Sequence, residues 1–477
     1  WTLMTCYNMV NGVYGCENEY LLRETLFDRW GFEGMVMTDW FASRNAESTA
    51  RCLNAGLTLE MPWPARYKAK PLQEALDEGS VTDDTLDDRV RRNLRVMFQT
   101  GLFDEPDSLP QGSRNTPEHQ ELVRRAAEEG MVLLKNEGNL LPLDMDRLNS
   151  ISLSGDNLKK KFGRLLYGGS SAVSPPYEVT PLQGMKERCR GKVDLVRGNK
   201  PADVAIIFAG LNHGRGGDSE SMDRESLHLD HGQVREIKEV AGEHLHTVVC
   251  LIAGSPIAMD EWINDVEAVL MCWYGGMEAG HAITNVLLGD VTPSGRLPLT
   301  FPRKLPDSPA HSTGSRRTYP GDKEKRVYYD EGIYVGYRWF DKKGIEPLFP
   351  FGFGLSYTQF EFGSISLDRA SVSKPEDTVV ASLEVTNSGA RTGAEVVQVY
   401  ARDLDASVDR PPKQLVGFEK VWLQPGESTE VRITIKAEDL AFYDETAGKW
   451  KAESGEFELL VGKSSREILR ETGLSYE

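Results

Sequence analysis

The chain has 477 residues, of which 40% are hydrophobic and 27% charged, and its net charge is −18. It is too long for one ordinary domain, so we expect about two to four. The negative charge argues against nucleic acid or an anionic membrane as the main partner, and apolar runs such as DVAIIFAG are too short to span a bilayer.

Residues 1–103 alternate between strand and helix patterns, which implies a parallel sheet with right-handed crossovers. The patterns predict strands at 2–7, 34–39 and 57–62, and helices at 17–31, 47–56 and 82–101. The last helix is strongly amphipathic, because Leu86, Val90, Leu94 and Met97 share one apolar face.

The rest of the chain divides by composition. A Pro-, Gly- and Ser-rich linker at 104–116 precedes a predicted helix at 117–137 and an α/β region that ends near residue 300. The best strands of that region are predicted at 151–153, 203–209, 247–253 and 268–272. Residues 301–360 are expected to form an ordered connector. From 361 to 477, alternating apolar residues and turn motifs predict an immunoglobulin-like β-sandwich.

The six cysteines are scattered, with no CxxC pair. They are Cys6, Cys16, Cys52, Cys189, Cys250 and Cys272. Three fall in apolar runs, where a free thiol behaves as a small core residue, and we expect no disulfide framework in so large a chain. This pattern slightly favours the cytoplasm over secretion. No signal peptide is visible, and the strand-like start WTLMTCYN suggests that Trp1 is not the natural beginning of a domain.

Asp39 is the first candidate catalytic residue. It ends the apolar run of GFEGMVMTDW, so its carboxylate is expected at the carboxyl edge of a parallel sheet, where catalytic groups gather. The neighbouring Trp40 offers an apolar platform for a sugar ring. The alternative is purely structural, because Asp is also a common helix N-cap.

The second candidate is Glu220 in the loop HGRGGDSESMDRESLHLDHGQ, residues 213–233. The loop follows a strand and carries many acidic groups, so it could deliver an acid into a cleft; the alternative is a flexible surface loop.

A phosphate or dinucleotide site is disfavoured, because neither a strand–GxGxxG–helix arrangement nor a GK[ST] motif is present. His213, His228 and His231 lack the spacing of a usual metal site. GGSSAV does not match a GxSxG nucleophile motif. We therefore expect no metal and no cofactor.

Several long motifs give a specific resemblance. The segments MTCYNMVNGVYGCENEYLLRETLFDRWGFEGMVMTDW, YGGSSAVSPPYEVTPLQGM, SESMDRESLHLDHGQ and YDEGIYVGYRWFDKKGIEPLFPFGFGLSYT resemble, in the same order, segments of glycoside hydrolase family 3, the β-glucosidases and β-xylosidases. The resemblance covers essentially the whole chain. It implies the C-terminal part of a (β/α)8-type barrel at 1–103, an α/β sandwich domain at 117–300 and a fibronectin type III-like domain at 361–477.

The resemblance also implies a mechanism and a set of site residues. Terminal non-reducing β-D-glucosyl residues would be removed with retention, with Asp39 as nucleophile and Glu220 as acid/base. Such chemistry places two carboxyl groups about 5–5.5 Å apart and requires the acid to begin protonated, so we expect the loop to bury Glu220 against the sugar and thereby raise its pKa. The implied sugar-binding residues are Met4, Tyr7, Trp40, Ser170 and Ser171.

The sequence departs from the family pattern in its first domain. Only three strand–helix repeats of the eight in such a barrel are recognisable. The family's acidic sugar ligand, its arginines and its Lys-His pair have no counterpart here. The partners we expect are β-linked glucosides or oligosaccharides, together with either an upstream barrel segment or a second copy of the chain. The alternatives are a β-xylosidase, a related exo-glycosidase such as an arabinosidase, or a non-catalytic fragment.

Overall fold

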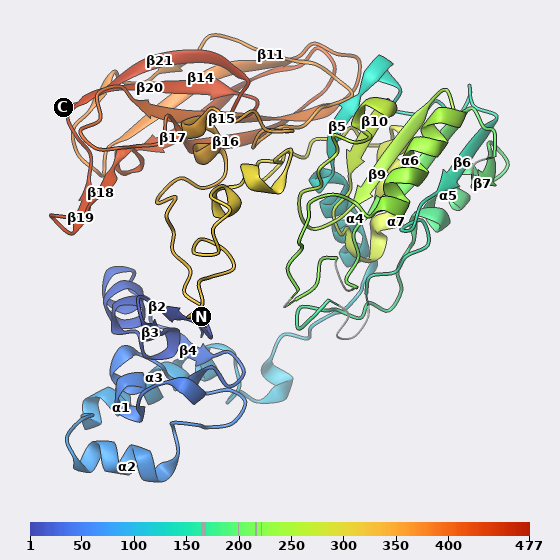
Figure 1. The fold of residues 1–477 in the computed structure, drawn as a ribbon. Coiled ribbons are helices and arrows are strands. Elements are labelled where there is room, and N and C mark those ends of the chain that lie inside the picture. Colours follow the sequence, from blue (N-terminus) through green and yellow to red (C-terminus); the bar gives the residue numbers. More distant parts are fainter. Residues whose placement is uncertain (164–167, 199, 215–216, 221) are drawn as a thin grey trace. The chain divides into compact units, whose positions relative to one another are not determined.

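The computed structural model describes residues 1–163, 168–198, 200–214, 217–220 and 222–477. The chain divides into two compact units, Trp1–Ser113 and Arg114–Glu477 (Figure 1). In the described part of the chain, none of the helices combines the length and apolar character needed to cross a membrane.

The first unit is built on two parallel strands, β1 and β4, in which Thr5 lies opposite Thr38. Its strands are β1 (Thr2–Thr5), β2 (Met9–Val10), β3 (Val13–Tyr14) and β4 (Met35–Thr38). Its helices are η1 (Gly15–Glu17), η2 (Tyr20–Arg29), η3 (Ala42–Asn45), α1 (Thr49–Ala55), α2 (Ala69–Asp77), α3 (Asp83–Gln99) and η4 (Pro106–Ser108). The helices predicted at 17–31, 47–56 and 82–101 are all present. The first of them, η2, is a π-helix, and beyond its end the Trp30 N–H donates to the Thr25 carbonyl (3.0 Å).

The strand predicted at 57–62 is wrong. Only Leu59 forms a bridge, to Met37 of β4. The Thr58 hydroxyl donates to the Val36 carbonyl (2.9 Å) and accepts the Val36 N–H (3.0 Å). The Thr58 side chain thus occupies the Val36 N–H, while the Val36 carbonyl also accepts the main-chain N–H groups of Thr58 and Leu59.

The apolar face predicted for α3 is only partly buried: Leu86 packs against Leu53, Ala75 and Val81, and the buried residues of the helix are Arg89 and Val96. Val90 and Leu94 are 46% and 39% exposed, whereas Arg89 is 7% exposed. Arg89 donates from Nε to the Leu53 carbonyl of α1 (2.9 Å), and the guanidinium of Arg92 lies 3.6 Å from the centre of a phenyl ring of η2. Polar side chains face inward here because they satisfy carbonyl groups and an aromatic face of the neighbouring elements.

The second unit begins with a three-layer α/β region. Its strands are β5 (Val132–Asn136), β6 (Ser150–Ser154), β7 (Asp194–Arg197), β8 (Val204–Gly210), β9 (Thr247–Ile252) and β10 (Ala268–Met271). Its helices are α4 (Pro117–Gly130), α5 (Pro181–Cys189), α6 (His231–Glu243) and α7 (Ala279–Leu288), with the short turns η5 (Glu137–Asn139), η6 (Ile263–Asp265) and η7 (Gly276–Glu278). The four strands predicted for this region are confirmed as β6, β8, β9 and β10.

The strand order of this sheet is β5-β10-β9-β8-β6-β7, with β5 antiparallel to β10 and the other strands parallel. The order of connection reverses between β6 and β8, and such a reversal opens a crevice at the carboxyl ends of the strands. The helix predicted at 117–137 is partly wrong, because α4 ends at Gly130 and β5 follows. Met131 to Leu134 are all nearly inaccessible, as expected for a strand covered on both faces.

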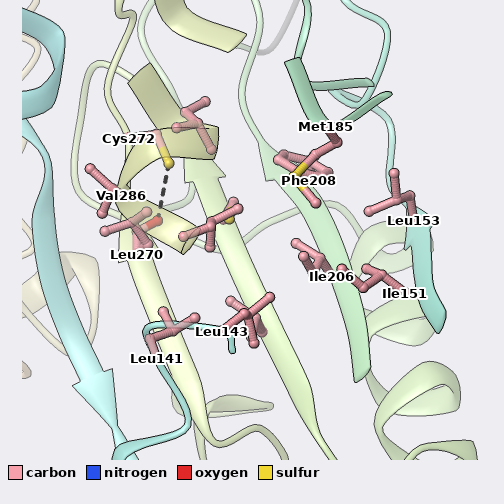
Figure 2. Packing of buried hydrophobic residues seen from close by; sticks show 14 of the residues in the cluster. Leu141, Leu143, Ile151, Leu153, Met185, Ile206, Phe208, Leu270, Cys272 and Val286 are labelled. Atoms are coloured by element: carbon pink, nitrogen blue, oxygen red, sulfur yellow. Dashed lines mark hydrogen bonds between the residues drawn. The ribbon is translucent and has the colours of Figure 1, made fainter. Parts of the chain in front are cut away.

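Both faces of the six-stranded sheet are apolar and covered by helices. Along β8, even-numbered residues such as Ile206 and Phe208 pack with α5 and α7, while odd-numbered residues such as Ile207 pack with α6. Figure 2 shows the first of these faces, with Met185 of α5 directed at Phe208. Because successive side chains of a strand point to opposite faces, this alternation alone assigns α5 and α7 to one layer and α6 to the other.

One polar contact joins two of the covering helices. His281 of α7 lies 2.6 Å from Glu278 through Nδ1 and 2.9 Å from Glu187 of α5 through Nε2. Burial disfavours the protonated ring, but the hydrogen bonds with Glu278 and Glu187 outweigh it and raise the pKa of His281. The charged ring therefore links α5 to α7.

The second unit ends in a β-sandwich of two antiparallel-rich sheets, reached through a connector. The sheets contain β11 (Phe360–Phe362), β12 (Ser366–Leu367), β14 (Thr378–Asn387) and β17 (Ser428–Lys436) on one side, and β13 (Ser371–Val372), β15 (Gly393–Asp403), β16 (Gln414–Leu423), β20 (Gly455–Gly462) and β21 (Ile468–Tyr476) on the other. The remaining elements are the hairpin β18 (Phe442–Asp444) and β19 (Lys449–Lys451), helix α8 (Tyr337–Lys343), and the short turns η8 (Leu305–Asp307), η9 (Pro309–His311) and η10 (Ala437–Leu440). The predicted alternation holds, since Val431 and Leu459 lie in the sandwich core. A buried ion pair, Arg296–Glu395, joins the sandwich to the α/β region.

Candidate functional site

Asp39 lies where β4 ends, at the carboxyl edge of the β1–β4 pair. Its main-chain N–H donates to the Thr5 carbonyl (3.3 Å), and its Oδ1 accepts the N–H of Trp40 (2.6 Å). The N-cap alternative is wrong, because the next helix, η3, has Phe41 at its N-cap and no side-chain capping bond. The partly exposed carboxylate is therefore held by a hydrogen bond within its own turn.

Three further predicted residues belong to the same edge of the first unit. Met4 is in β1, Tyr7 follows β1, and Trp40 follows Asp39; parallel pairing brings the carboxyl ends of the two strands together. Met4, Tyr7 and Trp40 are 57%, 53% and 50% exposed. All three side chains are thus accessible, on residues in or just after the two paired strands.

A buried carboxylate of the first unit was missed by sequence reasoning. Glu60, 6% exposed, accepts the main-chain N–H groups of Arg66 (3.0 Å) and Tyr67 (2.6 Å) and the hydroxyl of Ser43. It ties the turn after Asp39 to the loop after Leu59. The only sequence indication was an acidic residue at the end of the apolar run LTLE.

Glu220 lies in the loop that follows β8, and a glycine-serine segment holds it. Its N–H donates to the Gly168 carbonyl (2.9 Å). The Ser170 hydroxyl lies 2.8 Å from Oε1 and 2.6 Å from Oε2, and the Ser170 N–H donates to Oε2 (2.6 Å). Between these residues, Gly169 has φ +120°, and a Cβ there would lie 2.2 Å from Oε2 of Glu220. Only glycine allows the segment to approach the carboxylate so closely.

The raised pKa expected on burial of Glu220 against a sugar stays a prediction, because Glu220 is exposed in this structure. The hydrogen bond from the Ser170 hydroxyl, followed by that from the Ser170 N–H, lowers the pKa of this exposed carboxyl. The loop therefore favours the carboxylate form, and the donors that favour it come from a segment about fifty residues earlier in the sequence.

A pocket of about 800 Å³ opens beside Glu220, at the carboxyl ends of the parallel strands. Ser170 and Ser171 also line it, together with an aromatic wall in which the ring centres of Phe162 and Tyr274 are 5.0 Å apart. The structure thus unites Glu220 with both predicted serines, although only Ser170 bonds to it. Positions 215, 216 and 221 of the predicted loop lie outside the described residues.

The three loop histidines have different surroundings. His228 Nδ1 lies 2.8 Å from Glu261, and His213 Nδ1 lies 2.8 Å from the carbonyl of Asp218. His231 is the first residue of α6. Within the described ranges, the structure contains no group of three or more His, Cys, Asp and Glu side chains placed to hold a metal ion.

Two more residues of the acid loop escaped the sequence analysis. Asp218 accepts three hydrogen bonds from the neighbouring loops, and Asp223 accepts one from the hydroxyl of Tyr319 in the connector. The bond from Tyr319 raises the pKa of that phenol to about 12. The acidic density of the loop was visible, but the partners come from distant parts of the sequence.

Comparison with known families matches three stretches of the chain. Residues 2–96 match the N-terminal domain of glycosyl hydrolase family 3, residues 131–337 match the C-terminal domain of that family, and residues 395–465 match the fibronectin type III-like domain. The fold class expected from the motifs is thereby confirmed.

Curated relatives and solved structures agree. The chain is 39% identical to thermostable β-glucosidase B of Acetivibrio thermocellus, over 98% of this chain but only 62% of that protein. It is 33% identical to an exo-α-(1→6)-L-arabinopyranosidase of Bifidobacterium breve, over 100% of this chain and 63% of the relative. The GH3 β-glucosidase structure from Bifidobacterium adolescentis superposes with a TM-score of 0.90 at 32% identity, covering 100% of this chain and 69% of that one.

An α/β domain and a β-sandwich that follow part of a (β/α) barrel, with accessible carboxylates at two strand edges, define a multidomain carbohydrate-active architecture. The chain belongs to glycosyl hydrolase family 3. It spans less than two thirds of the length of the Acetivibrio and B. breve relatives.

Proposed function

We propose that this chain carries the catalytic carboxyl groups of a retaining β-glycosidase that removes terminal non-reducing β-D-glucosyl residues. The observation that carries the proposal is the partly exposed carboxylate of Asp39, which accepts the N–H of the exposed Trp40 at the carboxyl end of β4. Met4 and Tyr7 are exposed in and just after the neighbouring strand β1. An indole and a phenol offer apolar faces with polar edges, which suits a sugar ring, whose faces carry C–H groups and whose rim carries hydroxyls.

The proposed chemistry is double displacement. Asp39 attacks the anomeric carbon and forms a covalent glycosyl-enzyme, while Glu220 gives its proton to the departing oxygen. Glu220 then removes a proton from water, whose oxygen attacks the anomeric carbon and releases Asp39. A sugar hydroxyl that takes the Ser170 hydroxyl as its partner would remove the main cause of the lowered pKa of Glu220 and favour the protonated acid.

The role of Asp39 is tested by trapping. A 2-deoxy-2-fluoroglucoside with a dinitrophenolate leaving group should label the protein once, and peptide mapping should place the label on residue 39. Asp39→Asn should abolish both labelling and turnover of aryl β-glucosides. Asp28→Asn, an exposed carboxyl on η2, is the matched control and should label normally. A label on another residue would overturn the assignment.

The role of Glu220 is tested by leaving-group dependence. Glu220→Ala should reduce kcat/KM for a natural disaccharide by about 10²–10⁴-fold, because general acid catalysis contributes on this scale. It should affect the first step with 2,4-dinitrophenyl glucoside far less, because that leaving group departs without a proton. Glu225→Gln, in the same loop, is the control. Equal losses on both substrates would contradict the assignment.

A second candidate function is favoured by one comparison. The B. breve relative is named an exo-α-(1→6)-L-arabinopyranosidase, so a pentopyranose substrate is the alternative, as is a β-xyloside. Both sugars lack the hydroxymethyl group that glucose carries on C5, and L-arabinopyranose also has the opposite orientation of the hydroxyl on C4. A panel of 4-nitrophenyl β-glucoside, β-xyloside and α-L-arabinopyranoside separates the candidates, and the highest kcat/KM identifies the class.

We further propose that the first unit functions together with additional barrel strands. In the described residues β1 pairs only with β4, and Trp30, Trp63, Phe98 and Leu102 are each at least 62% exposed. So much exposed apolar surface on a small unit marks a contact surface. Size-exclusion chromatography with mass spectrometry of the intact sample tests this, since a second polypeptide or a homo-oligomer would supply the missing contacts. A well-behaved, inactive monomer would favour a non-catalytic fragment instead.

A further inference from the structure

The loop that carries Glu220 is fixed at Asp218, two residues earlier. Asp218 Oδ2 accepts the N–H of Gly254 (2.6 Å) and the hydroxyl of Tyr274 (2.9 Å), and Oδ1 accepts the hydroxyl of Ser255 (2.7 Å). These three donors lie on the segments that follow β9 and β10. One carboxylate therefore attaches the acid loop to the rigid end of the parallel sheet.

The loop is also fixed on the other side of Glu220. Arg224 donates from Nη1 to the Ser255 hydroxyl (2.9 Å) and to the Pro256 carbonyl (2.8 Å). Both attachment points involve the same turn after β9, so the main chain around Glu220 is held at two points a few residues apart. The Glu220 N–H, which donates to the Gly168 carbonyl, lies within this anchored stretch.

We infer that Asp218 is a positioning residue for Glu220. The inference rests on the proposed acid/base role of Glu220. A chain of two residues reaches at most about 7 Å, so movement at Asp218 is passed almost directly to residue 220. Displacing a catalytic group by about 1 Å can cost about 10²-fold in rate.

The competing explanation is that Asp218 only stabilises the turns after β9 and β10. Its loss would then lower stability and reduce all activities in the same proportion. A positioning role has a different signature, because it affects the position of the Glu220 amide and the steps that need a proton. Measuring both the hydrogen exchange of the Glu220 amide and the activity on two substrates separates the two explanations.

Asp218→Asn is the main test, since it keeps the size of the side chain but places an NH₂ group against donors. Asp203→Asn is the matched control: Asp203 accepts the N–H groups of Asn149 (2.6 Å) and Ser150 (3.0 Å) at the opposite, amino end of β8. Tyr274→Phe removes one of the three donors, keeps the ring, and serves if Asp218→Asn fails to fold. Hydrogen exchange at the Glu220 amide is measured by fragmentation mass spectrometry of the loop peptide.

We expect Asp218→Asn to speed exchange at the Glu220 amide at least about 10-fold, and Asp203→Asn to leave it unchanged. We also expect kcat/KM to fall about 10–100-fold for a disaccharide, and at least about 10-fold less for 2,4-dinitrophenyl glucoside. Azide, which attacks the glycosyl-enzyme without a base, should restore part of the lost turnover of that aryl substrate.

Unchanged exchange at the Glu220 amide would overturn the inference, whatever the activity. Faster exchange with proportional losses on both substrates would also overturn it, provided that Glu220→Ala shows the leaving-group difference. If Glu220→Ala shows no such difference, the acid role itself fails, and the exchange data still decide whether Asp218 fixes the loop.

Discussion

Gly169→Ala tests whether the close approach of the glycine-serine segment determines where Glu220 lies. A Cβ at residue 169 would lie 2.2 Å from Oε2 and 2.3 Å from Cβ of Glu220, whereas ordinary contacts begin at 3.4 Å. One side must therefore move by about 1.2 Å, the difference between 3.4 and 2.2 Å. Such a shift breaks hydrogen bonds to Ser170 that are only 2.6–2.8 Å long.

The expected consequence follows from that displacement. An acid misplaced by about 1 Å loses about 10²-fold in the steps that it catalyses. Gly169→Ala should therefore lower kcat/KM for a disaccharide by about 10²-fold and for 2,4-dinitrophenyl glucoside much less. Steady-state kinetics on these two substrates measures the difference.

A matched control separates this contact from backbone strain. Gly138 also has positive φ, +63° against +120° at Gly169, and a Cβ at that residue would have nothing within 4 Å, so Gly138→Ala introduces a milder strain without a collision. Activity within about twofold of the parent protein is expected for that variant. Equal losses in both variants, or no change in the substrate ratio of Gly169→Ala, would refute the reasoning.

Three further outcomes are expected. Ser170→Ala removes the main cause of the lowered pKa of Glu220, so the alkaline limb of the kcat/KM profile should move to higher pH; a limb that stays in place would exclude Glu220 as its source. Phe208→Ala empties a fully buried site and should cost about 3–5 kcal/mol in guanidinium unfolding, where less than about 1 kcal/mol would show that the core collapses around it. Because the pKa of His281 is raised in the folded state, the charged ring stabilises the fold fully below the unfolded pKa of about 6.5, and this stabilisation is lost as the pH rises through the folded pKa. His281→Gln should therefore flatten the dependence of the unfolding free energy on pH in that window, and an unchanged slope would contradict this reasoning.

The sheet of the α/β region could be predicted because its strands are continuous apolar runs. Residues such as Ile206 and Val249 are covered on both faces, so neither polar periodicity nor distant partners were needed to recognise them. β5 was assigned to the preceding helix because VLLKN is also acceptable in a helix. Its strand conformation depends on pairing with β10, far along the chain.

The buried face of α3 could not be predicted from hydrophobic periodicity alone. Hydrophobic periodicity predicts that Val90 and Leu94 lie on the buried face. Arg89 is buried instead, and it donates a hydrogen bond to a carbonyl of α1. The sequence around such a helix does not state which neighbouring carbonyls lack partners.

The candidate site also has one part that the sequence predicts and another that it does not. Asp39 and Glu220 were identified from motifs, and the strand edge that carries Asp39 follows from parallel pairing. The lowered pKa of Glu220 and the anchoring by Asp218 could not be predicted, because their causes are hydrogen bonds across long sequence separations.

The hydrogen bond from Tyr319 to Asp223 joins positions separated by 96 residues. During synthesis, at about 5–20 residues per second, Tyr319 leaves the ribosome roughly 5–20 s after Asp223. The acid loop thus acquires this partner only after the whole α/β region has been made. A nascent chain halted before that tyrosine would have a complete sheet but an incompletely tethered loop, so maturation of the loop follows translation of the connector.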